Sequence, residues 1–162
     1  MNLSSLLPFA LRAVRASIPG AVCSSAATLG TAAVCGLIEN RNALAPINDI
    51  THVFYGEEAF GARASTWGAR NLLRYTLPAI AWNTFALSGW ALLHGFLVGK
   101  RPSRARLLAA GIAVATIAYV IDYKLVSPRW TPGIEAHLSG RSLFAAYVAL
   151  ALGLALGRER GE

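Results

Sequence analysis

The sequence predicts an all-α membrane protein, a bundle of four transmembrane helices that forms one integral domain over residues 1–162. Four apolar stretches, at about 18–38, 77–99, 107–126 and 140–157, approach the ~20 helical residues that cross a hydrocarbon core of ~30 Å. Charged residues make up only 14% of the chain and lie almost wholly between these stretches. A soluble domain of this size would interrupt its apolar segments with charge, so this distribution indicates membrane spans.

The first stretch follows a mildly apolar N-terminal segment that contains Arg12 and Arg15. These arginines come after the apolar residues of that segment, so we expect a retained anchor and not a cleaved signal peptide. Residues 2–16 are predicted to form an interfacial helix that leads into the first span. Cys23 and Cys35 lie about 18 Å apart along that span, which excludes a bridge between them within one chain.

Polar residues follow one face of the first span and one face of the second. In the second span, Asn83 and His94 would be costly against lipid, so we expect both to point into the bundle. There they either hydrogen-bond the first span as structural contacts or contribute to a site, and the sequence leaves both readings open. The polar positions of the first span recur at three and four residues: Ser24, Thr28, Thr31, Cys35 and Glu39.

The fourth stretch is short, and we expect Ser139 to Ser142 to extend its helix into the headgroup region. Its small residues recur every four positions, which allows close backbone contact between helices in lipid. Such a face serves either packing within the bundle or a homo-oligomer through Gly153 and Gly157. The small residues at this spacing of four are Ala145, Ala149, Gly153 and Gly157.

The net charge of +7 predicts contact with lipid phosphates and not with nucleic acid, because the basic residues stand at the ends of apolar helices. Residues 100–106 carry four basic residues and no acidic one. By the positive-inside rule, we expect this short link and both termini to face the cytoplasm. The basic residues near the termini are Arg12, Arg15, Arg158 and Arg160.

The link over residues 39–76 is predicted to be amphipathic and to lie on the outer side. Asn48 or Asp49 is expected to cap a short helix that ends at Gly56. His52 follows Asp49 by three residues, so the carboxylate of Asp49 is expected to orient the imidazole. A second amphipathic piece, capped near residues 65–66, leads into the second span.

The other outer link begins with Asp122, in the last turns of the third span. An ionisable group at that depth is a functional-site hypothesis, and we expect Arg129 or Lys124 to be its partner. Thr131 followed by Pro132 predicts the start of a helix.

The two outer links collect most of the titratable side chains, so any site is expected there. His52, His137 and Asp122 are candidate metal ligands, although no pair has the spacing His-x-x-x-His or Glu-x-x-His. The alternative is that these residues are solvated at the interface. No Gly-x-Ser-x-Gly elbow is present, and no motif implies a cofactor. The candidate binding residues are Asn48, Asp49, His52, Glu57, Asn83, Asp122, Arg129, Glu135 and His137.

Five short motifs carry a resemblance to known sequences: Pro46-Ile47-Asn48 through His52, Tyr55-Gly56-Glu57, Thr76-Leu77-Pro78, Asp122-Tyr123-Lys124-Leu125 and Thr131-Pro132-Gly133-Ile134-Glu135. Through them the chain resembles a group of small uncharacterised bacterial inner-membrane proteins with four predicted spans. The resemblance covers most of the chain and implies the four-span topology, but no activity. Histidines stand near positions 83 and 84 in that group, and their absence here speaks against a histidine-metal site.

These observations predict an integral inner-membrane protein that serves as an accessory or envelope component. The alternative is a membrane-embedded enzyme or an ion-binding protein with its site at the outer face. A small transporter is a third interpretation, which would require an oligomer because four packed spans leave little room for a pathway.

Overall fold

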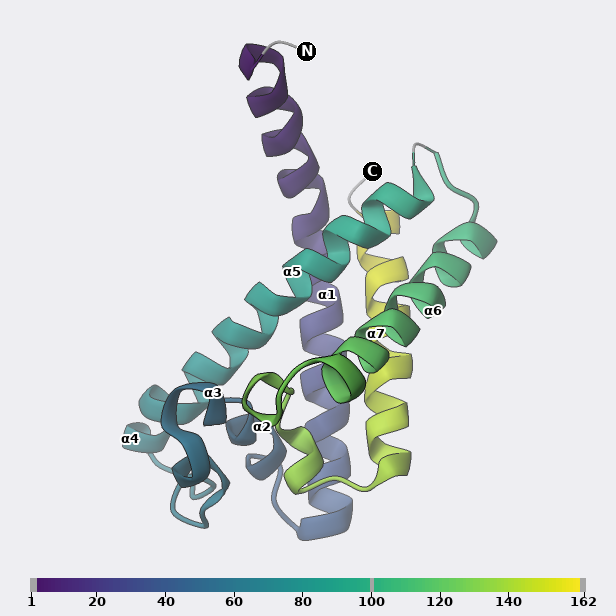
Figure 1. Cartoon of the computed structure of the whole chain (residues 1–162). Coiled ribbons are helices and arrows are strands. Elements are labelled where there is room, and N and C mark those ends of the chain that lie inside the picture. Colours follow the sequence, from purple (N-terminus) through teal and green to yellow (C-terminus); the bar gives the residue numbers. More distant parts are fainter. Residues whose placement is uncertain (1–2, 100, 161–162) are drawn as a thin grey trace.

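The structure, a computed structural model, describes the backbone of residues 3–99 and 101–160 and the side chains of residues 11–99 and 101–158. Every regular element in these residues is helical, which confirms the all-α prediction. Four long helices dominate the fold (Figure 1): α1 (Leu3–Asn40), α5 (Leu77–Val98), α6 (Arg104–Val120) and α7 (Gly140–Arg160).

Three segments among the described residues are long and apolar enough to cross a membrane: Leu11–Asn40, Arg104–Leu125 and Gly140–Arg158. They correspond to the first, third and fourth predicted spans. The second predicted span forms α5 but is not among them, because residues such as Asn83 and His94 lower its mean hydropathy. A multi-span membrane protein is therefore supported by three helices, and the four-span bundle is not confirmed.

Helix α1 runs without a break from Leu3, so the prediction of a separate interfacial helix over residues 2–16 is wrong; its residue 2 lies outside the described residues. The residues between Arg15 and Ile18 are compatible with a helix, and nothing there forces a turn. The helix ends in an αL cap at Arg41, whose φ is 55° and whose N–H donates to the Leu37 carbonyl at 3.1 Å. In this cap the N–H of Asn42 donates to the Gly36 carbonyl at 3.1 Å.

Helix α7 packs closely beside α1 (Figure 1), and glycines make the contact possible. A Cβ atom on Gly153 would lie 2.4 Å from Ser24 Cα, and one on Gly157 would lie 2.5 Å from Gly20 Cα. The small-residue face is therefore filled by α1 of the same chain. This packing within the chain leaves the predicted homo-oligomer through Gly153 and Gly157 unsupported.

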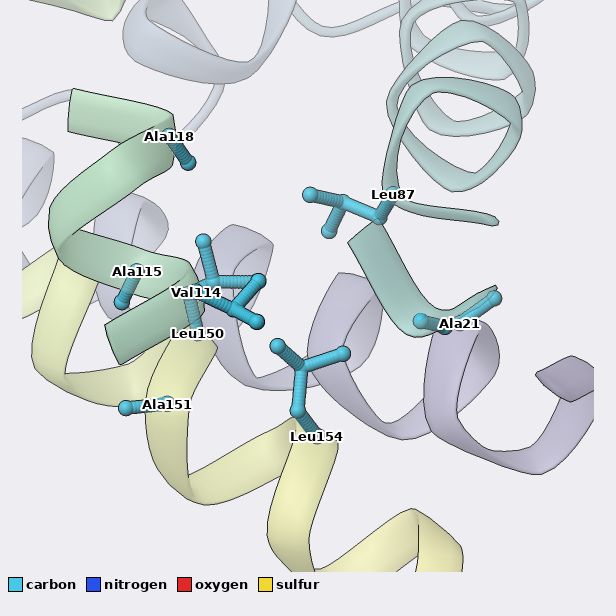
Figure 2. Close-up of a cluster of buried hydrophobic side chains, with 9 residues drawn as sticks. Ala21, Leu87, Val114, Ala115, Ala118, Leu150, Ala151 and Leu154 are labelled. Atoms are coloured by element: carbon cyan, nitrogen blue, oxygen red, sulfur yellow. The ribbon is translucent and has the colours of Figure 1, made fainter. Parts of the chain in front are cut away.

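The core lies where α1, α5, α6 and α7 approach one another. Figure 2 shows Leu87, Val114 and Leu154 directed into the space between their helices. Alanines complete this cluster, including Ala21 on α1. Small side chains thus set the close spacing, and a few larger ones fill the centre.

The two polar side chains predicted to face into the bundle from α5 contact two different helices. Asn83 Nδ2 donates to Ser25 Oγ on α1 at 3.0 Å, as expected for a side chain directed into the bundle. His94 is also buried, but its Nε2 faces the carbonyl oxygen of Leu107 on α6 at 3.0 Å. Helix α5 runs obliquely to α1 (Figure 1), so its two halves meet different helices.

Two links connect the helices at the end opposite the start of α1 (Figure 1). The first, residues 41–76, contains α2 (Ala45–Asp49), α3 (His52–Tyr55), η1 (Gly56–Phe60), α4 (Ala69–Asn71) and the π-helix η2 (Leu72–Thr76), which continues into α5. The second, residues 121–139, contains the π-helix η3 (Ile121–Leu125), which prolongs α6, then η4 (Pro128–Trp130) and η5 (Ile134–Ala136). Because α2 contacts η5, the two links form one unit, the link cap.

Three local predictions in the links need correction. The single helix expected from Asn48 or Asp49 to Gly56 is two short helices, although Gly56 with φ 59° does end the second one. The helix expected from residues 65–66 begins only at Ala69. Thr131 does not start a helix, since η5 begins after Gly133.

The cap also closes onto the ends of α1 and α7. The carboxylate of Glu39, in the last turn of α1, accepts hydrogen bonds from the Ser139 N–H at 2.8 Å and the Ser139 hydroxyl at 2.7 Å. A negative charge at the start of α7 is favourable for the helix dipole. The serines that were expected to extend the fourth span therefore anchor it to the first.

Candidate functional site

Asn48 holds the first link together and is completely buried. Its amide nitrogen donates to the Ala64 carbonyl at 2.7 Å, and its amide oxygen accepts from the Thr76 hydroxyl at 2.9 Å. These contacts join α2 to a distant turn and to the start of α5. Asn48 was a predicted binding residue, and in the structure its side-chain amide holds three segments of the first link together.

Asp49 pairs with His137 across the two links. Asp49 is completely buried, and its Oδ2 lies 2.7 Å from His137 Nδ1. Its Oδ1 has no hydrogen-bond partner among the described residues. Burial raises the pKa of Asp49 to about 7, an effect that the contact with His137 opposes and the negative charge of Glu135 reinforces. Asp49 was expected to orient His52; its carboxylate instead orients the histidine of the other link.

His52 bridges the two links through its ring nitrogens. Nδ1 lies 2.9 Å from the Asp49 carbonyl oxygen, and Nε2 lies 3.2 Å from the Pro128 carbonyl oxygen. The ring also stacks on Phe60, with 5.2 Å between centroids. Because both nitrogens face carbonyl oxygens, neither presents a lone pair to a metal ion.

The predicted metal ligands do not converge. Within the described part of the chain, no group of three or more His, Cys, Asp or Glu side chains could hold a metal ion. His52 faces carbonyl groups and His137 faces Asp49, while Asp122 is directed toward α7. The structure therefore does not bring together His52, His137 and Asp122 as a set of metal ligands.

Asp122 has a tyrosine as its partner, not Arg129 or Lys124 as expected. The Tyr147 hydroxyl donates to Asp122 Oδ2 at 2.7 Å. Asp122 lies in η3, which continues α6, and α6 packs against α7, so a donor on α7 is close at hand. Arg129 instead donates to the Val53 carbonyl at 3.2 Å and ties the second link to α3.

Glu135 is fixed by two hydroxyl groups of the second link. Its Oε1 accepts from Thr131 at 2.6 Å, and its Oε2 accepts from Tyr123 at 3.1 Å. Both carboxylate oxygens are thereby held in place by hydroxyl groups, and among the described residues Glu135 forms no ion pair. Glu135 thus presents a fixed carboxylate at the surface of the cap.

An open cleft of about 540 Å³ lies between the two links. Five predicted binding residues line it, whereas Asn48, Asp49 and His137 lie in the cap without lining it, and Asn83 lies in the contact between α5 and α1. The five are His52, Glu57, Asp122, Arg129 and Glu135. The cleft therefore gathers acidic side chains from both links beside one arginine.

The hydroxyl groups that organise this cleft were not among the predicted site residues. Tyr119 and Tyr123 are four residues apart, a spacing that places both on one helical face and could have drawn attention to them. Tyr147 gave no such signal, because its partner Asp122 is 25 residues away in the sequence. Thr131 is only four residues from Glu135, but it lies outside a helix, so helical spacing did not indicate the contact.

Comparison with protein-family models, with curated proteins and with solved structures found no match to this chain. The geometry of the site is therefore the basis for its interpretation.

Proposed function

We propose that the protein is a four-span integral protein of the bacterial inner membrane that acts as an accessory, ligand-binding component of the envelope. Its binding site is the cleft of the link cap, on the outer face of the membrane. The two termini and the link between α5 and α6 face the cytoplasm. The bilayer is its first partner, because three of its helices have the length and hydropathy of membrane spans.

The geometry of α5 supports its role as a membrane span in addition to the three more apolar helices. Its 22 residues extend about 33 Å, which matches a hydrocarbon core of ~30 Å. Its most polar side chains, Asn83 and His94, have partners on α1 and α6. Hydrogen bonding inside the bundle reduces the cost of placing such groups at membrane depth.

The distribution of basic residues supports the orientation. Four basic residues occur in positions 100–106 of the sequence. Helix α6, whose first turn contains two of them, begins at the end of the bundle that also holds the start of α1 (Figure 1). The link cap at the other end carries acidic groups such as Glu57 and Glu135. Short loops rich in Lys and Arg remain on the cytoplasmic side.

The single observation that carries the binding function is the fixed carboxylate of Glu135 in the cleft. Two hydroxyl donors hold this group before any ligand arrives. A preorganised polar group in a cleft is typical of a binding site, because little order must be gained when the ligand binds.

Cysteine labelling tests the location of the cleft. In a background with Cys23→Ala and Cys35→Ala, Ala136→Cys places a thiol in the cleft lining, and Ala105→Cys places one on exposed α6 near the opposite end. A membrane-impermeant maleimide added to intact spheroplasts should modify position 136, and should modify position 105 only after permeabilisation.

The two alanines are a matched pair, since both side chains are exposed in the structure. A reporter fused after Glu162 should independently indicate the cytoplasm. Labelling of position 105 and not of position 136 in intact spheroplasts would refute the orientation and remove the outer cleft from the proposal.

A second candidate, a membrane-embedded enzyme, has the Asp49–His137 pair in its favour. A buried carboxylate that orients a partly exposed imidazole is the arrangement of a general base. Its test is the rate at which diethyl pyrocarbonate acylates His137, followed by peptide mass spectrometry. An activated imidazole should react faster than free imidazole and should slow in Asp49→Asn. A rate equal to that of free imidazole would exclude this candidate.

A further inference from the structure

A long apolar groove lies between α6 and α7. Its volume is about 730 Å³, and its lining is almost entirely apolar, with Leu108, Ile112 and Leu152 among its residues. The groove extends along α6 from Leu108 to Tyr119, a rise of about 16 Å. This length matches one leaflet, about half of the ~30 Å hydrocarbon core.

The groove and the cleft of the link cap share one wall. Tyr119 and Tyr147 line the groove, while Asp122 and Tyr123 line the cleft. The Tyr147 hydroxyl donates to Asp122 Oδ2 at 2.7 Å, and the ring centroids of Tyr119 and Tyr123 are 5.2 Å apart. Only this layer of side chains separates the apolar hollow from the polar one.

The chemistry changes sharply across that wall. On one side the lining is hydrocarbon from two membrane spans, and on the other side it carries Glu57, Asp122 and Glu135 beside Arg129. Tyrosine is typical of the boundary between lipid and water, where its ring is buried and its hydroxyl is hydrated. A molecule that occupied both hollows would need one apolar chain and a polar head with a positive group.

We propose that the groove and the cleft together bind a bilayer lipid whose head carries a primary ammonium group and a phosphate, with one acyl chain along α6 and α7. The ammonium group is expected to meet Asp122 and Glu135, and the phosphate is expected to meet Arg129. Charge complementarity favours this zwitterionic head, since the cleft offers acidic groups and one guanidinium together. This inference rests on the proposed function, because it names the ligand of the same cleft.

Lipid retention tests the inference. The full chain is reconstituted in vesicles of equal amounts of phosphatidylethanolamine and phosphatidylglycerol, extracted in mild detergent, and analysed for lipid that copurifies. We expect phosphatidylethanolamine to be enriched about tenfold over phosphatidylglycerol, the effect of one charge-assisted hydrogen bond. Equal retention of the two lipids would overturn recognition of the head.

Two variants of the cleft also test recognition of the lipid head. Asp122→Asn and Glu135→Gln keep the shape of each side chain and remove its charge. Each should lower the enrichment toward that of an equal mixture, while the melting temperature in detergent shows whether the fold is retained. Unchanged enrichment in both folded variants would contradict the proposal.

A matched pair on α6 examines the acyl chain. Ile112 lines the groove and Ile117 does not, and both side chains are exposed. Ile112→Trp should fill the groove and lower the total retained lipid severalfold, whereas Ile117→Trp should leave it unchanged. Equal retention in the two variants would show that the groove does not hold the chain. Labelling of position 136 tests the proposed function separately. If position 136 is labelled from outside but the two lipids are retained equally, the lipid inference is refuted and the proposed function is not.

Discussion

Replacing Gly153 by alanine should destabilise the protein, because the backbone of α1 leaves no room for a side chain at this position of α7. The added Cβ would lie 2.4 Å from Ser24 Cα and 2.9 Å from the Cys23 carbonyl oxygen. Carbon atoms in ordinary contact are ~3.5–4.0 Å apart, so the two helices would have to separate by about 1 Å. The obstructing atoms belong to the backbone, and no side-chain rotation can relieve the contact.

The sign of the effect depends on two opposing contributions. Alanine in a helix interior is favoured over glycine by about 1 kcal/mol. Overpacking typically costs about 1–3 kcal/mol, and the separation also weakens the contacts around the fully buried Leu154. We therefore expect a net loss of about 1–2 kcal/mol in the free energy of unfolding.

The assay is reversible unfolding in mixed micelles with increasing SDS, followed by the fluorescence of the four tryptophans. Gly30→Ala and Gly89→Ala are the controls, because a Cβ at either helical position meets no described atom within 4 Å. These controls should be neutral or more stable by up to about 1 kcal/mol. A Gly153→Ala protein as stable as Gly30→Ala would refute the packing of α7 on α1.

Three further predictions concern the link cap and the spans. Asp49→Asn should remove a pH dependence of stability. Because the folded protein holds this proton with a pKa of about 7, well above the ordinary aspartate pKa of about 4, wild-type stability should fall by up to about 4 kcal/mol between about pH 4 and pH 7. Parallel stability curves for wild type and Asp49→Asn, measured by unfolding in detergent across that range, would contradict this reading. Gly133→Ala should loosen the cap by about 2–4 kcal/mol, since φ is 82° and its Cβ would lie 2.6 Å from His52 Nδ1; amide hydrogen exchange should increase in both links, and no change relative to Gly140→Ala would argue against it. Asn83→Ala should cost only about 0.6 kcal/mol, because Ser25 keeps its contact with Thr84 at 2.8 Å; a loss above about 2 kcal/mol in SDS unfolding would give Asn83 a larger role.

The long helices could be predicted from the sequence because hydropathy and length are local properties. The stretch near 77–99 shows the limit of that reasoning. Its helix is present as Leu77–Val98, but Asn83 and His94 reduce the hydropathy on which assignment of a span depends. The positions of those two side chains inside the bundle could be predicted, whereas the helix that His94 meets could not. That choice depends on the angle at which α5 crosses α1, and sequence periodicity does not report this angle.

The sequence could predict that titratable side chains gather in the two links, but it could not predict which of these side chains pair with one another. The expectation that Asp49 orients His52 rested on helical spacing, which brings residues three or four positions apart onto one face. The chain turns at Ile50 and Thr51 between two short helices, and the Asp49 carboxylate is left facing His137, 88 residues away. Contacts across such a distance are set by how the two links dock, which helical spacing does not report.

The partial burial of the cleft carboxylates explains why their partners are hydroxyl groups. Asp122 was expected to pair with a cation, but it accepts from Tyr147, and Glu135 likewise accepts from hydroxyl groups, those of Tyr123 and Thr131. Pairing with a cation would require two charged groups to lose water, a cost that often exceeds the attraction between them. A hydroxyl donor adds no second charge and keeps the carboxylate in place. The negative charge of the cleft therefore remains available to a ligand, which is the property that a site for a cationic head requires.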